Sequence, residues 1–154
     1  MKSNVIKADY QTVLNQTGTL SFVPNGNSMW PFLKNGKQTV IIEKLPTTVK
    51  ELDVVFFKRE NGDYVLHRVV AVDGEKLTVR GDSQLFTERI NKECAFGIMT
   101  GFYKGKNLVL ASDKSYIKKV EKWYKNGFFT RLKIKLFYAK LRFKQRIAKI
   151  VKGA

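Results

Sequence analysis

Three residues whose side chains could cooperate in acyl transfer stand at separate places in the chain: Ser28, Asp82 and the sole histidine, His67. A serine hydroxyl is a weak nucleophile until a positioned base takes its proton, and imidazole has a pKa suited to that task near neutral pH. A carboxylate can orient the imidazole, and a fold can assemble such a triad from distant segments. These residue types therefore predict a serine hydrolase site.

Short motifs around these residues resemble the signal peptidase I group of serine proteases. Residues 28–31, Ser-Met-Trp-Pro, are similar to the family's Ser-Met-x-Pro nucleophile box. Residues 52–56 resemble its Gly-Asp-Val-Val-Phe box, with Leu52 in place of the glycine. His-Arg-Val at 67–69 resembles its base box, and Gly-Asp-Ser at 81–83 its Gly-Asp-Asn box, all in family order within residues 19–101. Most bacterial members have lysine where this chain has His67, so the resemblance is closer to the endoplasmic-reticulum and spore-former branch, which uses Ser-His-Asp.

The resemblance leaves two acids for the third catalytic role. Asp82 is short and follows a glycine, which suits a structural turn or a hydrogen bond to the base. Glu88 stands where the family's third acid usually lies, a few residues beyond the Gly-Asp pair, and its longer side chain can also orient an imidazole. Both alternatives remain open at this point.

The resemblance also implies what surrounds the nucleophile. Many relatives carry a serine two positions before it, whose hydroxyl helps to hold the oxyanion, whereas this chain has Gly26. Backbone N–H groups near Ser28 and Met29 would then supply the oxyanion hole, and losing one such donor typically costs about two to three orders of magnitude in rate. Met29, Trp30 and Pro31, with the strand that bears the histidine, would line a cleft where an extended substrate adds as a strand.

The family likeness implies a peptide or protein substrate with small residues on the acyl side of the cut. We expect removal of a leader or signal-type segment from a small ribosomally made peptide. Two alternatives come from other classes: self-cleavage, as in repressor-type relatives with the same serine box, and a non-catalytic β-module that binds a membrane or a partner through its basic tail. The sequence contains neither a metal-binding cluster nor a Gly-rich phosphate loop, so we expect no cofactor.

Short runs of β-branched and aromatic residues over residues 1–112 predict a mainly β domain. They predict strands at 20–23, 39–43, 54–58, 64–72, 77–80, 96–102 and 108–111. Asn-Gly at 61–62, Asp-Gly at 73–74 and Lys-Gly at 104–105 are typical of tight hairpin turns. Three hairpins favour antiparallel strands in a barrel or sandwich. The resemblance implies the signal peptidase-like version, two β-rich sheets with the serine on a loop at their junction.

Residues 113–154 have a different character and predict a basic two-helix appendage. Ser112 or Asp113 can cap a helix that runs to about Asn126, and a second helix is expected from near Phe128. Residues 115–154 hold thirteen Lys or Arg and one acid, a net charge of +12 within the chain's total of +16. The second helix has apolar residues on opposite sides and basic flanks. We therefore expect it to contact an anionic membrane surface. The alternatives are a solvated basic helix that packs on the β-domain, and binding of nucleic acid or an acidic peptide.

The sequence also predicts where the protein works. No stretch approaches the roughly 18 apolar residues that a spanning helix needs, and the first ten residues carry charges where relatives have a membrane anchor. No secretory signal is visible, and a single cysteine, Cys94, agrees with a reducing compartment. We expect a cytoplasmic protein, peripheral on the inner face of the membrane.

Overall fold

The chain divides into two compact units, Met1–Ile117 and Lys118–Ala154. The computed structural model describes residues 9–152, so the charged segment 1–8, where no membrane anchor is expected, lies outside the described residues. The elements in chain order are α1 (Tyr10–Thr17), β1 (Thr19–Phe22), β2 (Thr39–Lys44), β3 (Val54–Lys58), β4 (Tyr64–Asp73), β5 (Lys76–Arg80), β6 (Glu88–Asn91), a 3-10 turn (Lys92–Cys94), β7 (Ala95–Lys104), β8 (Asn107–Leu110), α2 (Lys114–Lys125) and α3 (Gly127–Lys152).

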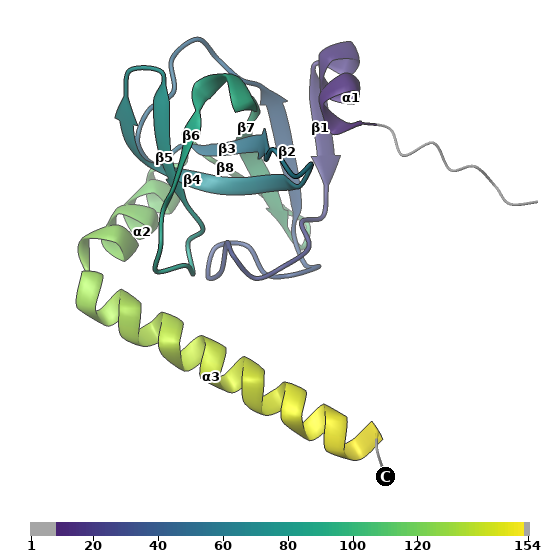
Figure 1. Cartoon of the computed structure of the whole chain (residues 1–154), viewed down its shortest axis with the longest axis vertical. Coiled ribbons are helices and arrows are strands. Elements are labelled where there is room, and N and C mark those ends of the chain that lie inside the picture. The colour runs from purple at the N-terminus through teal and green to yellow at the C-terminus, as the bar shows by residue number, and fades with distance from the viewer. Residues whose placement is uncertain (1–8, 153–154) are drawn as a thin grey trace, which may run out of the picture. The chain divides into compact units, whose positions relative to one another are not determined.

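All seven predicted strands are present, and they join with β6 in one antiparallel sheet. The order is β1-β2-β7-β3-β4-β5-β6, and β8 pairs with β7. The three predicted glycine turns join β3 to β4, β4 to β5 and β7 to β8. In Figure 1 the strands curl around a common interior rather than lying flat. The mainly β class with a helical pair at the carboxyl end is confirmed.

Two elements were not predicted from the sequence, α1 and β6. Strand β6 contains one apolar residue, Ile90, so it has almost no alternating pattern, and it forms by pairing with β5. Helix α1 is short and weakly amphipathic, but its Leu14 is fully buried and its Tyr10 ring packs on Phe22 and Phe56. Both elements are therefore stabilised by tertiary contacts rather than by local pattern.

Strand β3 separates two packed regions, because successive side chains of a strand point to opposite faces. Phe57 belongs to an aliphatic core, whose members are Val49, Val55, Phe57, Val69, Leu77, Val79 and Ala95. Phe56 contacts the rings of Tyr64 and Phe96 on the other side. Strand β3 is thus packed on both faces, and its pairing with β4 positions the strand that carries His67.

Helices α2 and α3 follow the last strand. Asp113 marks the start of α2, since its backbone carbonyl accepts the Ile117 N–H at 2.9 Å. The side chain of Thr130, in the first turns of α3, donates to the Trp123 carbonyl at 2.6 Å. Among residues 9–152, no helix combines the length and apolar content needed to cross a membrane.

Candidate active site

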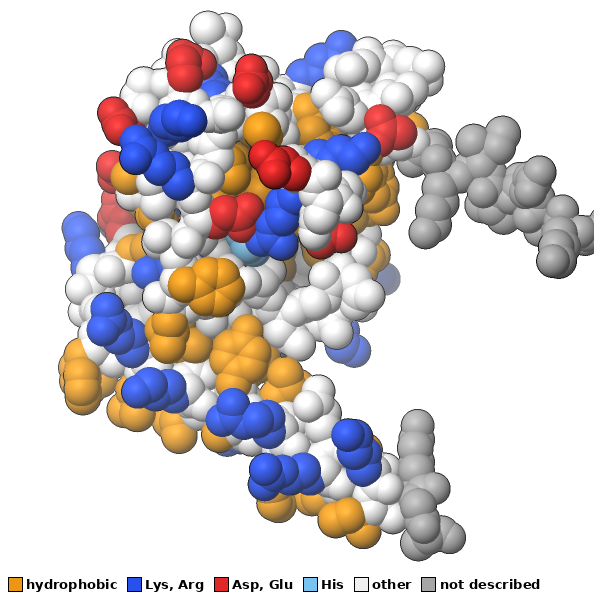
Figure 2. Space-filling view, viewed as in Figure 1, with side chains coloured by type: hydrophobic (Ala, Val, Ile, Leu, Met, Phe, Trp, Pro, Cys, Tyr) orange, Lys and Arg blue, Asp and Glu red, His pale blue; other side chains and the backbone are white. Residues whose placement is uncertain are grey.

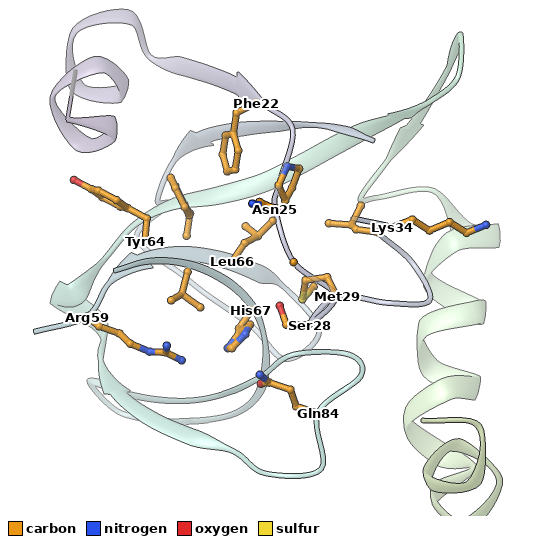
Figure 3. A pocket seen from close by; sticks show the side chains of 15 residues that line it. Phe22, Asn25, Ser28, Met29, Lys34, Arg59, Tyr64, Leu66, His67 and Gln84 are labelled. Carbon is orange, nitrogen blue, oxygen red and sulfur yellow. The ribbon is translucent and has the colours of Figure 1, made fainter. Parts of the chain in front are cut away.

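Ser28 and His67 come from separate elements and line the same cavity. Ser28 lies in the loop between β1 and β2, and His67 lies in the middle of β4, paired with Val55 of β3. The cavity has a volume of about 290 Å³. Figure 3 shows the hydroxyl and the imidazole side by side within it. The predicted nucleophile and the predicted base thus both belong to the lining of one cavity.

The cavity has an apolar part and a polar part. The apolar side chains come from Phe22, Pro24, Met29, Leu33, Phe56, Tyr64, Val65 and Leu66. In addition to Ser28 and His67, the polar residues of the lining are Asn25, Lys34, Arg59 and Gln84, and Gly26 completes it. A few convergent polar groups in an apolar cleft are typical of a site that orients a substrate.

The loop after β5 fixes the backbone of the serine loop. The Ser83 N–H donates to the Ser28 carbonyl at 2.8 Å, and the Ser83 hydroxyl donates to the Asn27 carbonyl at 2.7 Å. Gly81 allows this approach, because a Cβ there would lie 2.8 Å from the Ser28 carbonyl oxygen. The glycine of the Gly-Asp-Ser motif is therefore required by close contact with the nucleophile segment.

Arg68, the neighbour of the histidine, holds several segments of the site together. It is 1% exposed, and its Nε and Nη2 donate to the two carboxylate oxygens of Asp82, each at 2.8 Å. Its Nη1 donates to the Leu52 carbonyl at 2.8 Å, and Nη2 also contacts the Tyr116 hydroxyl at 3.0 Å. The guanidinium also lies over the Phe32 ring of the serine loop. Asp82 thus anchors the loop after β5 through a buried ion pair.

Sequence reasoning did not identify Arg68 as a site residue, although a signal was available. A charged residue inside an otherwise apolar strand is almost never buried without a partner. Arg68 lies within the run that predicts β4, so a buried carboxylate partner was to be expected. No comparable signal predicts that Ser83 bonds the serine loop or that Gln84 lines the cavity, because both depend on how the loops meet.

Leu52 has a left-handed backbone conformation, with φ 72°, at the position where the family has glycine. This conformation directs its carbonyl to Arg68, but it costs a residue with a Cβ about 1–2 kcal/mol. Leu52→Gly relieves this strain, but it loses side-chain contacts and gives the unfolded chain more freedom. The net expected result is a free energy of unfolding raised by about 0.5–1 kcal/mol. Urea denaturation measures the change. Leu52→Ala is the control, because it keeps the strain and loses contacts; if it proved as stable as the glycine variant, strain would not be the cause.

The two candidate acids are each paired with an arginine. Asp82 is 0% exposed and bound to Arg68, as described above. Glu88, the first residue of β6, pairs with Arg59 through Nε at 3.0 Å and through Nη2 at 2.5 Å, and this pair is partly exposed. The Nδ1 atom of His67 is buried and has no hydrogen-bond partner among residues 9–152. Each candidate acid thus has an arginine as its ion-pair partner.

The surroundings of His67 keep its imidazole neutral. Burial, and after it the positive charge of Arg59, lower its pKa from the ordinary value of 6.5 to about 4. The charges of Glu88 and Asp82 act in the opposite direction. The hydrogen bonds from Arg59 in turn lower the pKa of Glu88. A neutral imidazole at physiological pH is the form that can accept a proton from a serine hydroxyl.

The other predicted residues of the serine loop have distinct positions. The Gly26 N–H donates to the Asn35 side chain at 2.9 Å, so this amide already has an acceptor. Met29 lines the cavity and is 4% exposed. Trp30 and Pro31, joined by a cis peptide bond, belong to the turn that follows and are not part of the cavity lining. The backbone N–H groups of Ser28 and Met29 donate to no backbone carbonyl of residues 9–152.

The amino-acid sequence of the chain also matches a known protein family. Residues 10–122 match the family described as signal peptidase, peptidase S26. The chain belongs to this family. The match includes all eight strands and both residues of the Ser28 and His67 pair, so the predicted family is confirmed and supports a peptidase. A search of curated proteins finds no match for this chain.

The peptidase shows no candidate metal site in the part of the chain that the structure describes. Within residues 9–152, no three His, Cys, Asp or Glu side chains gather closely enough to hold a metal ion.

Proposed function

We propose that this peptidase hydrolyses peptide bonds through an acyl-enzyme, with Ser28 as nucleophile and His67 as general base. His67 takes the hydroxyl proton, the serine oxygen attacks the scissile carbonyl, and the protonated imidazole gives its proton to the leaving amine. Water then releases the acyl group by the same route. The observation that supports the proposal is that the neutral imidazole and the hydroxyl share one cavity.

The oxyanion of this reaction needs donors that are fixed before the substrate arrives. The N–H groups of Ser28 and Met29 are suitable, because no backbone carbonyl of the described chain accepts them. Ser83 holds this segment from the opposite side through the Ser28 carbonyl. Such preorganised donors stabilise charge as it develops, at little cost in reorganisation.

Of the two acids, we propose Glu88 as the one that adjusts the basicity of His67. The Arg68 and Asp82 pair is fully buried and would cost several kcal/mol to break, which suits a positioning role for Asp82. The Arg59 and Glu88 pair is partly exposed, so Glu88 can exchange partners at a lower cost. The charges of Glu88 and His67 also act on each other's pKa.

The cavity and the adjacent sheet edge fit an extended peptide. Strand β1 ends the sheet order, so one of its edges has no strand partner among the described residues, and its last residue, Phe22, lines the cavity. A peptide could add to this edge by main-chain hydrogen bonds and present a bond to Ser28. Together with the family membership, this supports leader or signal-type segments as the substrate, with small residues on the acyl side of the cut.

A fluorophosphonate probe, which reacts with activated serines, tests the proposal. Wild type is expected to be labelled, and Ser28→Ala to lose the labelling altogether. Ser115→Ala is the matched control, because Ser115 is an exposed serine outside the cavity and its loss should leave labelling unchanged.

Two other outcomes would point to different functions. Equal labelling of wild type and Ser28→Ala would exclude the proposed enzyme activity and favour a non-catalytic β-module. Intact-mass measurement adds the second arm: a wild-type chain that shortens on incubation, while Ser28→Ala keeps its full mass, would indicate self-cleavage in place of an external substrate.

A further inference from the structure

Helix α3 carries a row of large apolar side chains in contact with solvent. At 100° per residue, six of its residues fall on one narrow stripe. All six are exposed: Phe129, Leu132, Leu136, Phe143, Ile147 and Ile150. These side chains give the unit formed by residues 118–154 a continuous exposed apolar face. Apolar residues scattered singly over a surface would not form such a face.

Basic residues border this stripe on both sides. Residues 127–152 contain nine Lys or Arg and no acid. On the helical wheel, Lys133, Lys140 and Lys144 follow one edge of the stripe, and Arg131, Lys135, Arg142, Arg146 and Lys149 lie beyond the other. Figure 2 shows basic side chains alternating with exposed hydrophobic ones along this helix.

This combination fits the boundary between lipid headgroups and acyl chains. Long basic side chains can reach anionic headgroups while the stripe between them enters the acyl boundary. The helix is about 39 Å long at 1.5 Å per residue, and no helix of the described chain is apolar enough to cross a membrane, so α3 would lie parallel to the surface. Nucleic acid would satisfy the charges but leave the phenylalanine, leucine and isoleucine side chains in water.

We propose that α3 binds an anionic lipid surface in its plane and thereby holds the peptidase at a membrane. Each Lys or Arg near an anionic leaflet contributes about a five-fold gain in binding, so several of them together give firm attachment at low salt. The proposal does not depend on the proposed reaction, because its test measures binding and not hydrolysis.

Sedimentation of the full chain with vesicles tests the proposal. Wild type is expected to bind vesicles that contain phosphatidylglycerol far more tightly than vesicles of phosphatidylcholine alone, and to be released by salt. The double variant Leu136→Gln/Phe143→Gln is expected to bind the anionic vesicles at least about ten-fold more weakly, because it removes two apolar side chains from the stripe. Both side chains are exposed, so the fold should be retained, and circular dichroism checks the helix content.

Leu85→Gln/Phe86→Gln is the matched control in the other unit. Leu85 and Phe86 are 51% and 63% exposed, against 54% and 64% for Leu136 and Phe143, and they lie outside the cavity lining. This control should bind as wild type does. Equal losses in both double variants, or none in the α3 variant, would overturn the proposal. Binding that survives the α3 substitutions and is displaced by duplex DNA would identify a polyanion surface and would also overturn it.

Discussion

Arg68→Met is expected to lower the free energy of unfolding by about 3–5 kcal/mol, because it leaves the Asp82 carboxylate buried without its cation. The two side chains are 1% and 0% exposed and share two hydrogen bonds of 2.8 Å. Lysine would not restore the contact, since a single ammonium cannot reproduce the parallel bonds to Asp82 together with those to Leu52 and Tyr116. Urea denaturation followed by tryptophan fluorescence measures the loss.

Two further variants separate the effect of burying an ion pair from the effect of losing a charge. Arg89→Met breaks an ion pair with Asp73 whose side chains are well exposed, and its expected cost is about 0–1 kcal/mol. Arg68→Met/Asp82→Leu removes both buried charges, so it should recover much of the stability of wild type. Its activity should stay low, because the loop that holds Ser28 loses its anchor. If Arg68→Met costs no more than Arg89→Met, the buried pair does not organise the site.

A second large effect is expected in acid solution. Because burial and the charge of Arg59 lower the pKa of His67 to about 4, the imidazole stays neutral down to that pH, and the acid limb of kcat/KM should lie near 4 in place of 6.5. At pH 5 this keeps about 30-fold more of the base neutral than an ordinary histidine would. In the unfolded chain the histidine has its ordinary pKa, so between pH 6.5 and 4 only the unfolded state binds the proton. The free energy of unfolding should therefore fall by roughly 3 kcal/mol over this range, and His67 should cause no further change below it.

Two substitutions should move the pKa of His67 in opposite directions. Arg59→Gln removes a positive charge that lowers it, so the pKa and the acid limb should rise. Glu88→Gln removes a negative charge that raises it and frees Arg59 from its partner, so both should fall.

The sole histidine makes this measurement direct. In an NMR spectrum all histidine ring signals come from this one imidazole, so their chemical shifts can be followed across the pH range in wild type and in both variants. A wild-type pKa near 6.5, or shifts of the same sign in the two variants, would contradict the electrostatic account of the site. Circular dichroism at each pH confirms that the chain remains folded.

Much of the fold follows from local patterns. The β-branched runs and the glycine turns predicted seven strands, because alternating burial and positive φ leave a direct trace in residue type. The trace is absent for β6, which has one apolar residue, and for α1, whose place depends on Leu14 and Tyr10 meeting side chains from other elements. Such contacts join residues far apart in the chain, so no window of sequence contains them.

The amino-acid sequence alone determined the family, the candidate serine and histidine, and the basic amphipathic character of the last helix, because motifs and periodicity are properties of residue order. The tertiary structure alone decided how the acids are used: Asp82 joins Arg68, and Glu88 joins Arg59 beside the cavity. It also set the low pKa of His67, which arises from burial and from the positive charge of Arg59. Desolvation and charge depend on distances through space, and folding determines those distances.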